Sequence, residues 1–197
     1  NPKPKMEFAH PISLGIESEE EVASIVLFLN KTSDKNGLKK FVECLNQNLP
    51  SGVQINKIMD ISEYVLKRNG KKKKSLMALY GGADYNVSSI SVTENVKQLI
   101  IWLQENSIGE DCTVLNGDSL KNKRYITSFQ LTIRNRNRKK SNIIYVLSEY
   151  LKECGLNRVP LEKYTITRTR VYVNENEQNN TMISYSDYFN RLFESSQ

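Results

Sequence analysis

Three stretches of the chain carry apolar residues at helical spacing. The first stripe repeats at i, i+3, i+4 and i+7, which is typical of one buried helix face, and consists of Leu38, Phe41, Val42 and Leu45. The second follows Thr93, a suitable N-cap, and consists of Val96, Leu99, Ile100 and Leu103. The third begins after Ser141 and ends before Gly155, and consists of Ile143, Leu147, Tyr150, Leu151 and Cys154. Residues 186–196 predict a further short helix.

Apolar runs and alternating patterns predict strands between these helices. Residues 22–29 form a continuous β-branched and apolar run, and residues 53–59 alternate between apolar and polar side chains. A short extended segment at the start of the chain is bounded by prolines. Further strands are predicted at 83–91, 111–116 and 123–133. Residues 75–80 fit either a strand or a helical turn.

The segment "YTITRTRVYV" (164–173) has the clearest strand pattern of the chain. Successive side chains of a strand point to opposite faces of a sheet. Strict alternation therefore predicts one face made of Tyr164, Ile166, Arg168, Arg170 and Tyr172. The other face is expected to consist of Thr165, Thr167, Thr169, Val171 and Val173.

The order of these elements predicts an α+β protein built from two ferredoxin-like (split βαβ) halves. Residues 75–197 give the order β-α-β-β-α-β, followed by the C-terminal helix. Residues 1–66 give β-β-α-β, which is the same order without its initial strand and helix. We therefore expect the chain to begin after a lost strand and helix, through natural truncation, trimming, or numbering from the first ordered residue. A basic loop, residues 67–74, separates the halves.

The charged residues are segregated along the chain, and this distribution bears on the function. Lys and Arg number 28 against 22 Asp and Glu, so the net charge is +6. Residues 121–140 hold eight basic residues and no acid, and residues 67–74 hold six basic residues and no acid. The acidic residues near the start are Glu17, Glu19, Glu20 and Glu21. Such segregation favours a surface for a polyanion, and the alternative is a pair of solvated loops.

Several classes of protein are disfavoured by composition. No apolar run approaches the roughly 20 residues that span a bilayer, and the start has no apolar signal-peptide core. The single histidine, His10, excludes a multi-histidine metal site, and we expect it to be structural. We interpret Cys44, Cys112 and Cys154 as core residues of a reduced, cytoplasmic protein. We expect the glutamates to form a solvated surface rather than a metal or catalytic site.

Three segments carry a resemblance to a known family. They are "NPKPKMEFAHPISLGIESEEE" (1–21), "LNQNLPSGVQI" (45–55) and "ITRTRVYV" (166–173). They resemble the radical-SAM-linked domain of unknown function, which is found in bacteria as the C-terminal part of cobalamin-binding-type radical SAM proteins. The family also occurs as a separate protein, often encoded beside ribonuclease E/G. The resemblance implies a role in RNA processing or modification and supplies no catalytic residue.

The match is dense over the first 60 residues and thin between residues 60 and 160. In the family, a strand and an arginine-rich helix usually precede the "NPKPK" segment, which agrees with the element count above. The segment "RYITSFQLTI" (124–133) departs from the family's arginine-containing pattern. The short three-cysteine motif that holds a [4Fe–4S] cluster is absent from this sequence. No cofactor is therefore predicted in this chain, and such a cluster would belong to another segment or chain.

The predicted function is a non-catalytic RNA-binding accessory domain that works with a radical SAM enzyme or with ribonuclease E/G. Guanidinium groups suit two-point contacts with phosphate, and the basic loop before the third helix adds to the positive end of that helix dipole. The residues expected to contact phosphate are Lys71, Lys72, Lys73, Lys74, Arg134, Arg136, Arg138, Lys139, Lys140, Arg168 and Arg170, and Tyr172 is expected to stack on a base. The alternative for the arginine strand is a face of cross-strand pairs.

Two other functions stay open at the level of sequence. One is a protein-docking domain without nucleic-acid contact, whose loop would consist of Pro11, Ser13, Leu14, Gly15, Glu17 and Ser18. In the structural alternative, this loop only needs the backbone freedom of glycine. The other is an enzyme whose site needs the missing N-terminal segment.

Overall fold

The chain folds as a mixed α+β protein, which confirms the predicted class. The computed structural model describes residues 5–27, 35–62, 74–91, 95–106, 109–116, 125–134, 142–153, 164–176 and 181–194. Its helices are α1 (Lys35–Asn48), α3 (Leu76–Leu79), α4 (Asn95–Glu105), α5 (Ile143–Glu153) and α6 (Tyr185–Glu194). Its strands are β1 (Met6–Phe8), β2 (Glu17–Ser18), β3 (Ala23–Ile25), β4 (Tyr80–Ser91), β5 (Gly109–Asn116), β6 (Tyr125–Arg134), β7 (Tyr164–Asn176) and β8 (Thr181–Ser184).

The main sheet has the strand order β2-β7-β4-β6-β5, and the short strand β8 also pairs with β7, at the residues Tyr172–Asn176. The long strands β4, β5, β6 and β7 are antiparallel to their neighbours, whereas β2 runs parallel to β7. Along the chain, β4-α4-β5-β6-α5-β7 follows the element order expected for residues 75–197. Residues 75–80 were predicted to be either a strand or a helical turn. Most of them form the short helix α3, which leads directly into β4.

The N-terminal part differs from the expectation. The strands β1 and β3 form a separate two-stranded sheet, in which Met6 pairs with Ile25. The segment between them adds β2 to the edge of the main sheet, so residues 5–27 span both sheets. The strand predicted at 53–59 is wrong, because these residues form no strand pairs. Instead the Asn46 side chain of α1 bonds both backbone groups of Ile55, at 2.7 and 3.0 Å.

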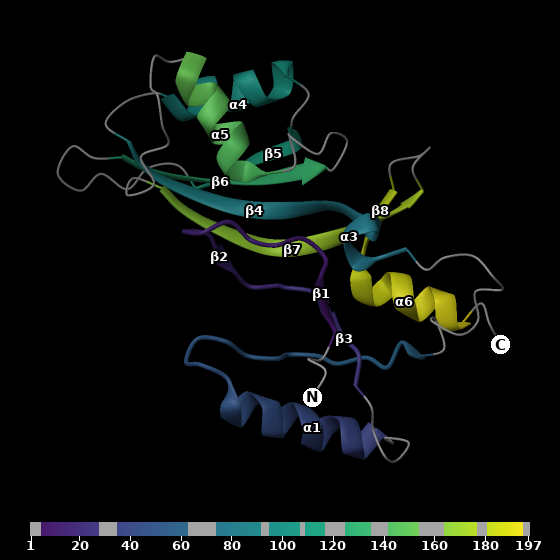
Figure 1. Ribbon diagram of the computed structural model, residues 1–197. Coiled ribbons are helices and arrows are strands. Elements are labelled where there is room, and N and C mark those ends of the chain that lie inside the picture. Colours follow the sequence, from purple (N-terminus) through teal and green to yellow (C-terminus); the bar gives the residue numbers. More distant parts are fainter. Residues whose placement is uncertain are drawn as a thin grey trace.

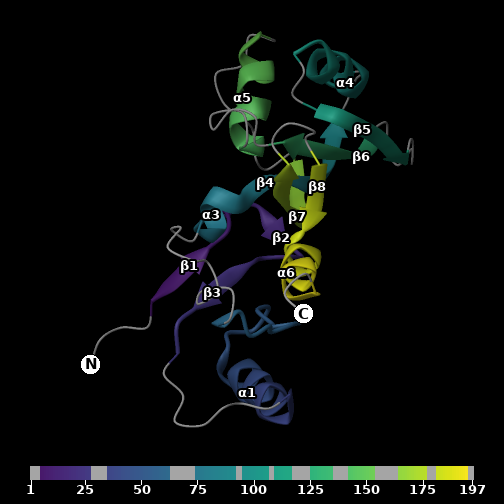
Figure 2. The same cartoon turned by 90° about the vertical axis from the view of Figure 1, so that its right-hand side faces the viewer.

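One face of the main sheet is apolar and lies under two helices. Val87, Leu131 and Ile133 have no exposed surface, and they belong to one hydrophobic cluster with residues of α4 and α5. Figures 1 and 2 show α4 and α5 together on one side of the sheet. Burial of this face is the main driving force for folding the region. The register places polar side chains of the same strands on the opposite face.

A β-bulge interrupts β7 between the two arginines. Asp84 pairs with Arg170, whereas the next residue, Tyr85, pairs with Arg168, so Thr169 is an extra residue. An extra residue shifts the alternation of side chains along the strand. Arg168 and Tyr85 consequently lie on the apolar face, while Arg170 and Asp84 lie on the opposite face. The prediction that both arginines share one face is therefore wrong.

Two smaller expectations also need correction. The third helix was expected to be capped by Ser141, which lies outside the described residues, and the observed cap is Asn142. Its Oδ1 accepts hydrogen bonds from the backbone N–H groups of Ile144 and Tyr145, at 2.8 and 3.4 Å. Cys44 was expected in the core, but it is exposed on α1. Among the described residues, no helix is long and apolar enough to cross a membrane.

Candidate nucleic-acid interface

The face of the main sheet that points away from the apolar cluster carries polar side chains around one glycine. Gly82 pairs with Arg134 on one side and with Tyr172 on the other. Asp84 pairs in the same way with Thr132 and Arg170. Side chains two positions apart on a strand share a face. We call this surface the polar sheet face, and it consists of Gly82, Asp84, Asn86, Gln130, Thr132, Arg134, Arg170, Tyr172 and Asn174.

Asp84 is the centre of a hydrogen-bond network on this face. The Thr132 hydroxyl donates to Oδ1 of Asp84 at 2.7 Å, and the Tyr172 hydroxyl donates to Oδ2 at 2.6 Å. Only 8% of Asp84 is exposed, so these bonds satisfy a carboxylate that has lost most of its water. The Arg170 side chain bonds the Tyr172 hydroxyl in turn, and this bond raises the pKa of Arg170.

Tyr172 is fixed by this network. Burial, followed by the hydrogen bond to Asp84, raises the pKa of Tyr172 to about 12. The phenol therefore stays neutral at physiological pH, and its hydroxyl remains a donor to the carboxylate. A half-buried ring held at its hydroxyl is restricted in its rotamers. The polar sheet face thus combines an exposed arginine with an aromatic ring in a defined position.

Glu20 lies beside this network, just after β2. Its side chain is half-buried, and burial raises its pKa. The positive charge of Arg170 opposes that shift, whereas the negative charge of Asp84 adds to it. Glu20 therefore carries a charge that the protein stabilises less well than water does. The next residue, Glu21, points to the other face, where it pairs with Arg168.

We expect Glu20 to make the folded state less stable as the pH rises. The folded protein raises the pKa of Glu20 above its ordinary value of 4.5, so the unfavourable contribution grows as the pH rises from about 4.5 through the raised pKa. Glu20→Gln removes this titration. Thermal unfolding between pH 4.5 and 7 should show the variant gaining stability relative to the parent as the pH increases. A difference that is constant across this range would contradict the assignment.

Arg168, predicted to contact phosphate, is instead buried on the apolar face with 1% of its surface exposed. Its Nη2 forms an ion pair with Glu21, and its Nη1 donates to the backbone carbonyl of His10 at 2.9 Å. With so little exposed surface, the Arg168 side chain cannot contact an RNA phosphate in this structure. Because a buried guanidinium needs a counter-charge and acceptors, Arg168 fixes the N-terminal segment against the sheet.

His10 belongs to the same buried cluster. Its ring stacks on Tyr80, with 4.3 Å between the ring centroids. Burial, together with the positive charge of Arg168, lowers the pKa of His10, so the ring is favoured in its neutral form. Burial also raises the pKa of Tyr85, which is bonded to Arg168. This arrangement agrees with the structural role expected for His10.

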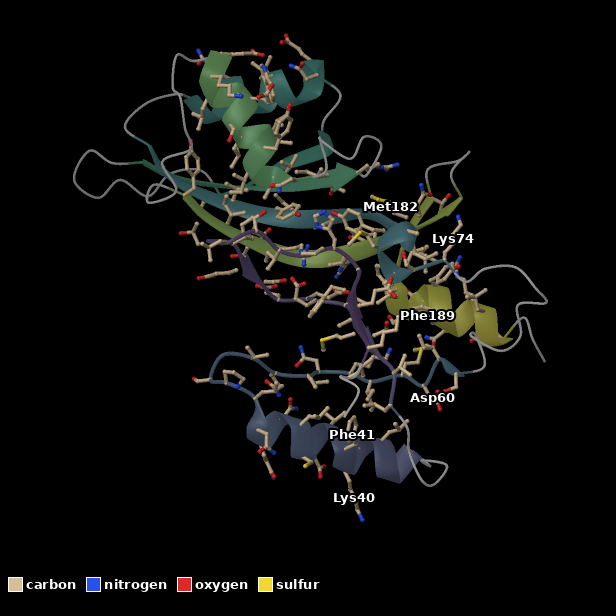
Figure 3. All side chains as sticks on the ribbon, in the orientation of Figure 1. Lys40, Phe41, Asp60, Lys74, Met182 and Phe189 are labelled. Carbon is tan, nitrogen blue, oxygen red and sulfur yellow. The ribbon has the colours of Figure 1, made fainter. Side chains whose placement is uncertain are left out.

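The structure brings together only part of the predicted basic set. Arg134 and Arg170 share the polar sheet face with Tyr172. Lys74 is exposed and precedes Ser75, the N-cap of α3 (Figure 3). The remaining predicted contacts lie outside the described residues, and they are Lys71, Lys72, Lys73, Arg136, Arg138, Lys139 and Lys140.

Sequence reasoning missed the polar network of β4 and β6. Asp84, Asn86 and Thr132 were not singled out, although Asp84 and Asn86 alternate with the apolar or aromatic residues around Tyr85 in "GADYNVS" (82–88). That alternation was a signal for a strand with one polar face. Glu20 was noticed only as part of an acidic run, because its neighbourhood depends on contacts with residues far away in the sequence.

The predicted docking loop is an anchored turn with an exposed tip. The Ile16 backbone N–H donates to the Ser13 carbonyl at 3.2 Å, and Gly15 has a φ of 85° that side chains rarely adopt. The Asn142 side chain at the start of α5 donates to the Ser13 hydroxyl at 3.1 Å. Leu14 is 97% exposed at the tip. The turn therefore presents one large apolar side chain to the solvent from a fixed position.

The part of the chain that the structure describes contains no set of side chains suited to bind a metal ion. Within those ranges, no group of three or more His, Cys, Asp or Glu residues is placed to hold a metal ion. The carboxylate of Asp84 is already occupied by two hydroxyl donors.

Fold and site define an α+β protein whose main sheet is apolar on one face and carries a polar network on the other. Residues 1–181 match the model of a family described as an uncharacterized protein conserved in bacteria, DUF2344. Since this match covers most of the chain, the chain belongs to that family. No curated protein matches the chain. No solved structure matches it either.

Proposed function

We propose that the protein is a non-catalytic RNA-binding accessory domain and that the polar sheet face is its binding surface. The observation that carries the proposal is the placement of Arg134, Arg170 and Tyr172 on one sheet face, on the strands β6 and β7 that flank β4. Sheets that bind single-stranded RNA use aromatic rings for stacking and cations for the backbone. The net charge of +6 favours association with a polyanion.

The proposal includes a finer assignment of the fold and of the partners. The strand order β7-β4-β6-β5, with all neighbours antiparallel, supports a ferredoxin-like arrangement for residues 75–197. The family resemblance supports a partner that acts on RNA, either a radical SAM enzyme or ribonuclease E/G. The domain would then hold RNA for the chemistry of that partner.

Replacing Arg170 should weaken RNA binding. Arg170→Ala removes an exposed guanidinium, so we expect a loss of affinity for a single-stranded RNA octamer and a salt slope smaller by about 1. Arg170→Lys should keep the slope and recover only part of the affinity, because an ammonium lacks the planar fork. Fluorescence anisotropy from 25 to 200 mM salt measures both quantities.

The control for this experiment is Lys40→Ala. Lys40 is exposed on α1 and extends away from the sheet (Figure 3), so its loss removes one charge without touching the polar sheet face. Equal effects of Arg170→Ala and Lys40→Ala would show that only net charge matters and would contradict the proposed surface. Absence of binding by the parent protein at low salt would overturn RNA binding altogether.

Tyr172 offers a test of stacking. Tyr172→Ala should lower RNA affinity about 5- to 100-fold, because base–aromatic stacking contributes about 1–3 kcal/mol. Tyr172→Phe keeps the ring and loses the hydroxyl bond to Asp84, so its RNA affinity should stay within about threefold of the parent. Urea unfolding of both variants controls for damage to the fold. Equal RNA affinities of the two variants would exclude stacking.

A second function is favoured by the exposure of Leu14. A rigid turn that presents an apolar tip beside the exposed Glu17 and Glu19 suits a protein partner with an apolar pocket and a basic rim. Purified ribonuclease E/G of the same organism is the probe. Leu14→Ser should abolish retention of the ribonuclease by the immobilised domain. Ile12→Ser, a change in the same segment, shows how damage to the fold alone affects retention. Retention of the enzyme by the Leu14 variant would exclude this docking mode.

A further inference from the structure

The two-stranded sheet formed by β1 and β3 has an open outer edge. The Val26 backbone N–H donates to the Lys5 carbonyl at 2.9 Å, so these two residues form a hydrogen-bonded pair. Such pairs alternate with non-hydrogen-bonded pairs along antiparallel strands. The backbone N–H and C=O groups of Met6 and Phe8 therefore point away from β3. Within the described ranges these groups have no hydrogen-bond partner, and Figure 2 shows β1 as the outer strand of this sheet.

One face of the same sheet is apolar and exposed. Met6 lies directly opposite Ile25, and Phe8 lies opposite Ala23. Since alternate side chains of a strand share a face, all four lie on one face, where Met6, Phe8 and Ile25 are 42–56% exposed. Two strands alone are only marginally stable in water, and a stable sheet needs about three or more strands with an apolar face. A strand added to the outer edge of β1 would extend both the hydrogen bonds and this face.

The charges of β1 are complementary to those of a second β1 that runs in the opposite direction. Met6 lies between Lys5 and Glu7, and neither of these charged residues forms an ion pair in the part of the chain that the structure describes. We propose that two copies of this protein associate by antiparallel pairing of β1, with Met6 of one copy opposite Met6 of the other. Lys5 of each copy then lies opposite Glu7 of the other, and opposite charges across neighbouring strands attract.

Charge selects this register over its neighbour. An antiparallel pairing centred on Glu7 would place the two Glu7 carboxylates opposite each other, and like charges in that position are destabilising. In the pairing centred on Met6, the two Met6 residues exchange two backbone hydrogen bonds. Met6 and Ile25 of both copies then form one continuous apolar row across four strands. A contact that uses the same patch on both copies is closed, so it gives a dimer rather than a filament.

The experiment measures the dimer dissociation constant of the full chain by sedimentation equilibrium in about 0.15 M salt. At this ionic strength the Debye length is about 8 Å. The repulsion between two chains of net charge +6 is therefore largely screened, whereas charges on adjacent strands still interact. The parent protein should show a reversible monomer–dimer equilibrium. A parent protein that stays monomeric up to about 1 mM would overturn the inference.

Exchanging the charges tests the pairing directly. Lys5→Glu places two carboxylates opposite each other, and Glu7→Lys places two ammonium groups opposite each other, so each variant alone should dimerise about tenfold more weakly or worse. In an equimolar mixture, the two variants restore opposite charges at both positions. The mixture should therefore form a heterodimer with a dissociation constant within about threefold of the parent value. The control Lys40→Glu makes the same charge change on α1 and should dimerise like the parent.

Met6→Pro tests the backbone hydrogen bonds without relying on charge. The Met6 N–H points away from β3, so its loss leaves the hydrogen bonds between β1 and β3 intact, as proline at a strand edge does. The variant should keep the far-ultraviolet circular dichroism of the parent and be monomeric. Met6→Leu retains the N–H and should dimerise like the parent. This comparison also decides the matter if the half-buried Glu7 does not tolerate the change to lysine.

The remaining outcomes are equally decisive. Dimers that persist in both Lys5→Glu and Met6→Pro would assign the contact to another surface and overturn the inference. Two folded charge variants that fail to form a heterodimer would do the same. The outer edge of β1 belongs to a different sheet from the polar sheet face, so none of these results depends on RNA binding.

Discussion

Replacing Glu21 with Ala is expected to lower the free energy of unfolding by about 3 kcal/mol, although Glu21 is an acid near the surface. The side chain of Glu21 is 35% exposed, but its partner Arg168 is only 1% exposed. Removing the carboxylate leaves a buried guanidinium that cannot lose its proton. The Nε of Arg168 already has no partner among the described residues. The loss of stability arises from the buried arginine that remains without its counter-charge. Because Glu21 is partly exposed to water, we expect this loss near the lower end of the range for buried ion pairs.

The matched control for this prediction is Glu19→Ala. Glu19 is an exposed glutamate two positions away, and its contact with Arg168 is made by the backbone N–H. Its side chain can be removed with an effect within about 0.5 kcal/mol. Urea denaturation gives both values, and for a chain of this size the Glu21 variant should melt roughly 6–12 °C lower. Equal stability of the two variants would show that the buried pair contributes little.

The Glu21–Arg168 pair also explains why the N-terminal segment cannot be treated as a separate half. Arg168 lies in the middle of β7, and its two main partners, Glu21 and the His10 carbonyl, come from the start of the chain. The β2 strand adds the same segment to the edge of the main sheet. Sequence periodicity describes one element at a time, so it contains no information about such long-range contacts. The ββαβ interpretation of residues 1–66 had no means of detecting them.

Local patterns predicted the elements of residues 75–197 well for a physical reason. The elements α4, α5, β4, β6 and β7 each bury apolar side chains in the same cluster, so burial and periodicity agree in them. The stripe of α5 is an example: Ile143, Leu147 and Leu151 are all buried. The strand predicted at 53–59 alternates equally well, but no neighbouring strand pairs with it. Alternation is necessary for a half-buried strand and does not supply its partner.

The candidate site was only partly predictable because one inserted residue changes its geometry. The sequence correctly singled out Arg170 and Tyr172 as neighbours on a face. The bulge at Thr169 then removes Arg168 from that face. A bulge in an antiparallel pair has no simple signature in a strand of alternating threonine and arginine. The acids beside these residues come from elsewhere in the chain, Asp84 from β4 and Glu20 from the segment after β2, and could not be joined to the site by spacing.

Replacing Gly81 with Ala is the other change with a large expected effect. A Cβ at Gly81 would lie 2.5 Å from the Asn174 backbone nitrogen and 2.7 Å from the Val173 carbonyl carbon. These atoms belong to the backbone of β7 and cannot move aside as a side-chain tip does. The strands β4 and β7 would have to separate beside the register shift between Tyr80 and Gly82. We expect a loss of about 3 kcal/mol, at the upper end for overpacking.

Gly52→Ala separates crowding from backbone conformation in this prediction. Gly52 has a φ of 87°, and a Cβ there would meet nothing within 4 Å. Its replacement should therefore cost only the strain of the left-handed region, about 1 kcal/mol. Urea denaturation of both variants measures the difference. If the Gly52 variant loses as much as the Gly81 variant, close approach of β4 and β7 is not what requires glycine. A larger loss at Gly81, accompanied by weaker RNA binding, would tie the spacing of these strands to the geometry of the polar sheet face.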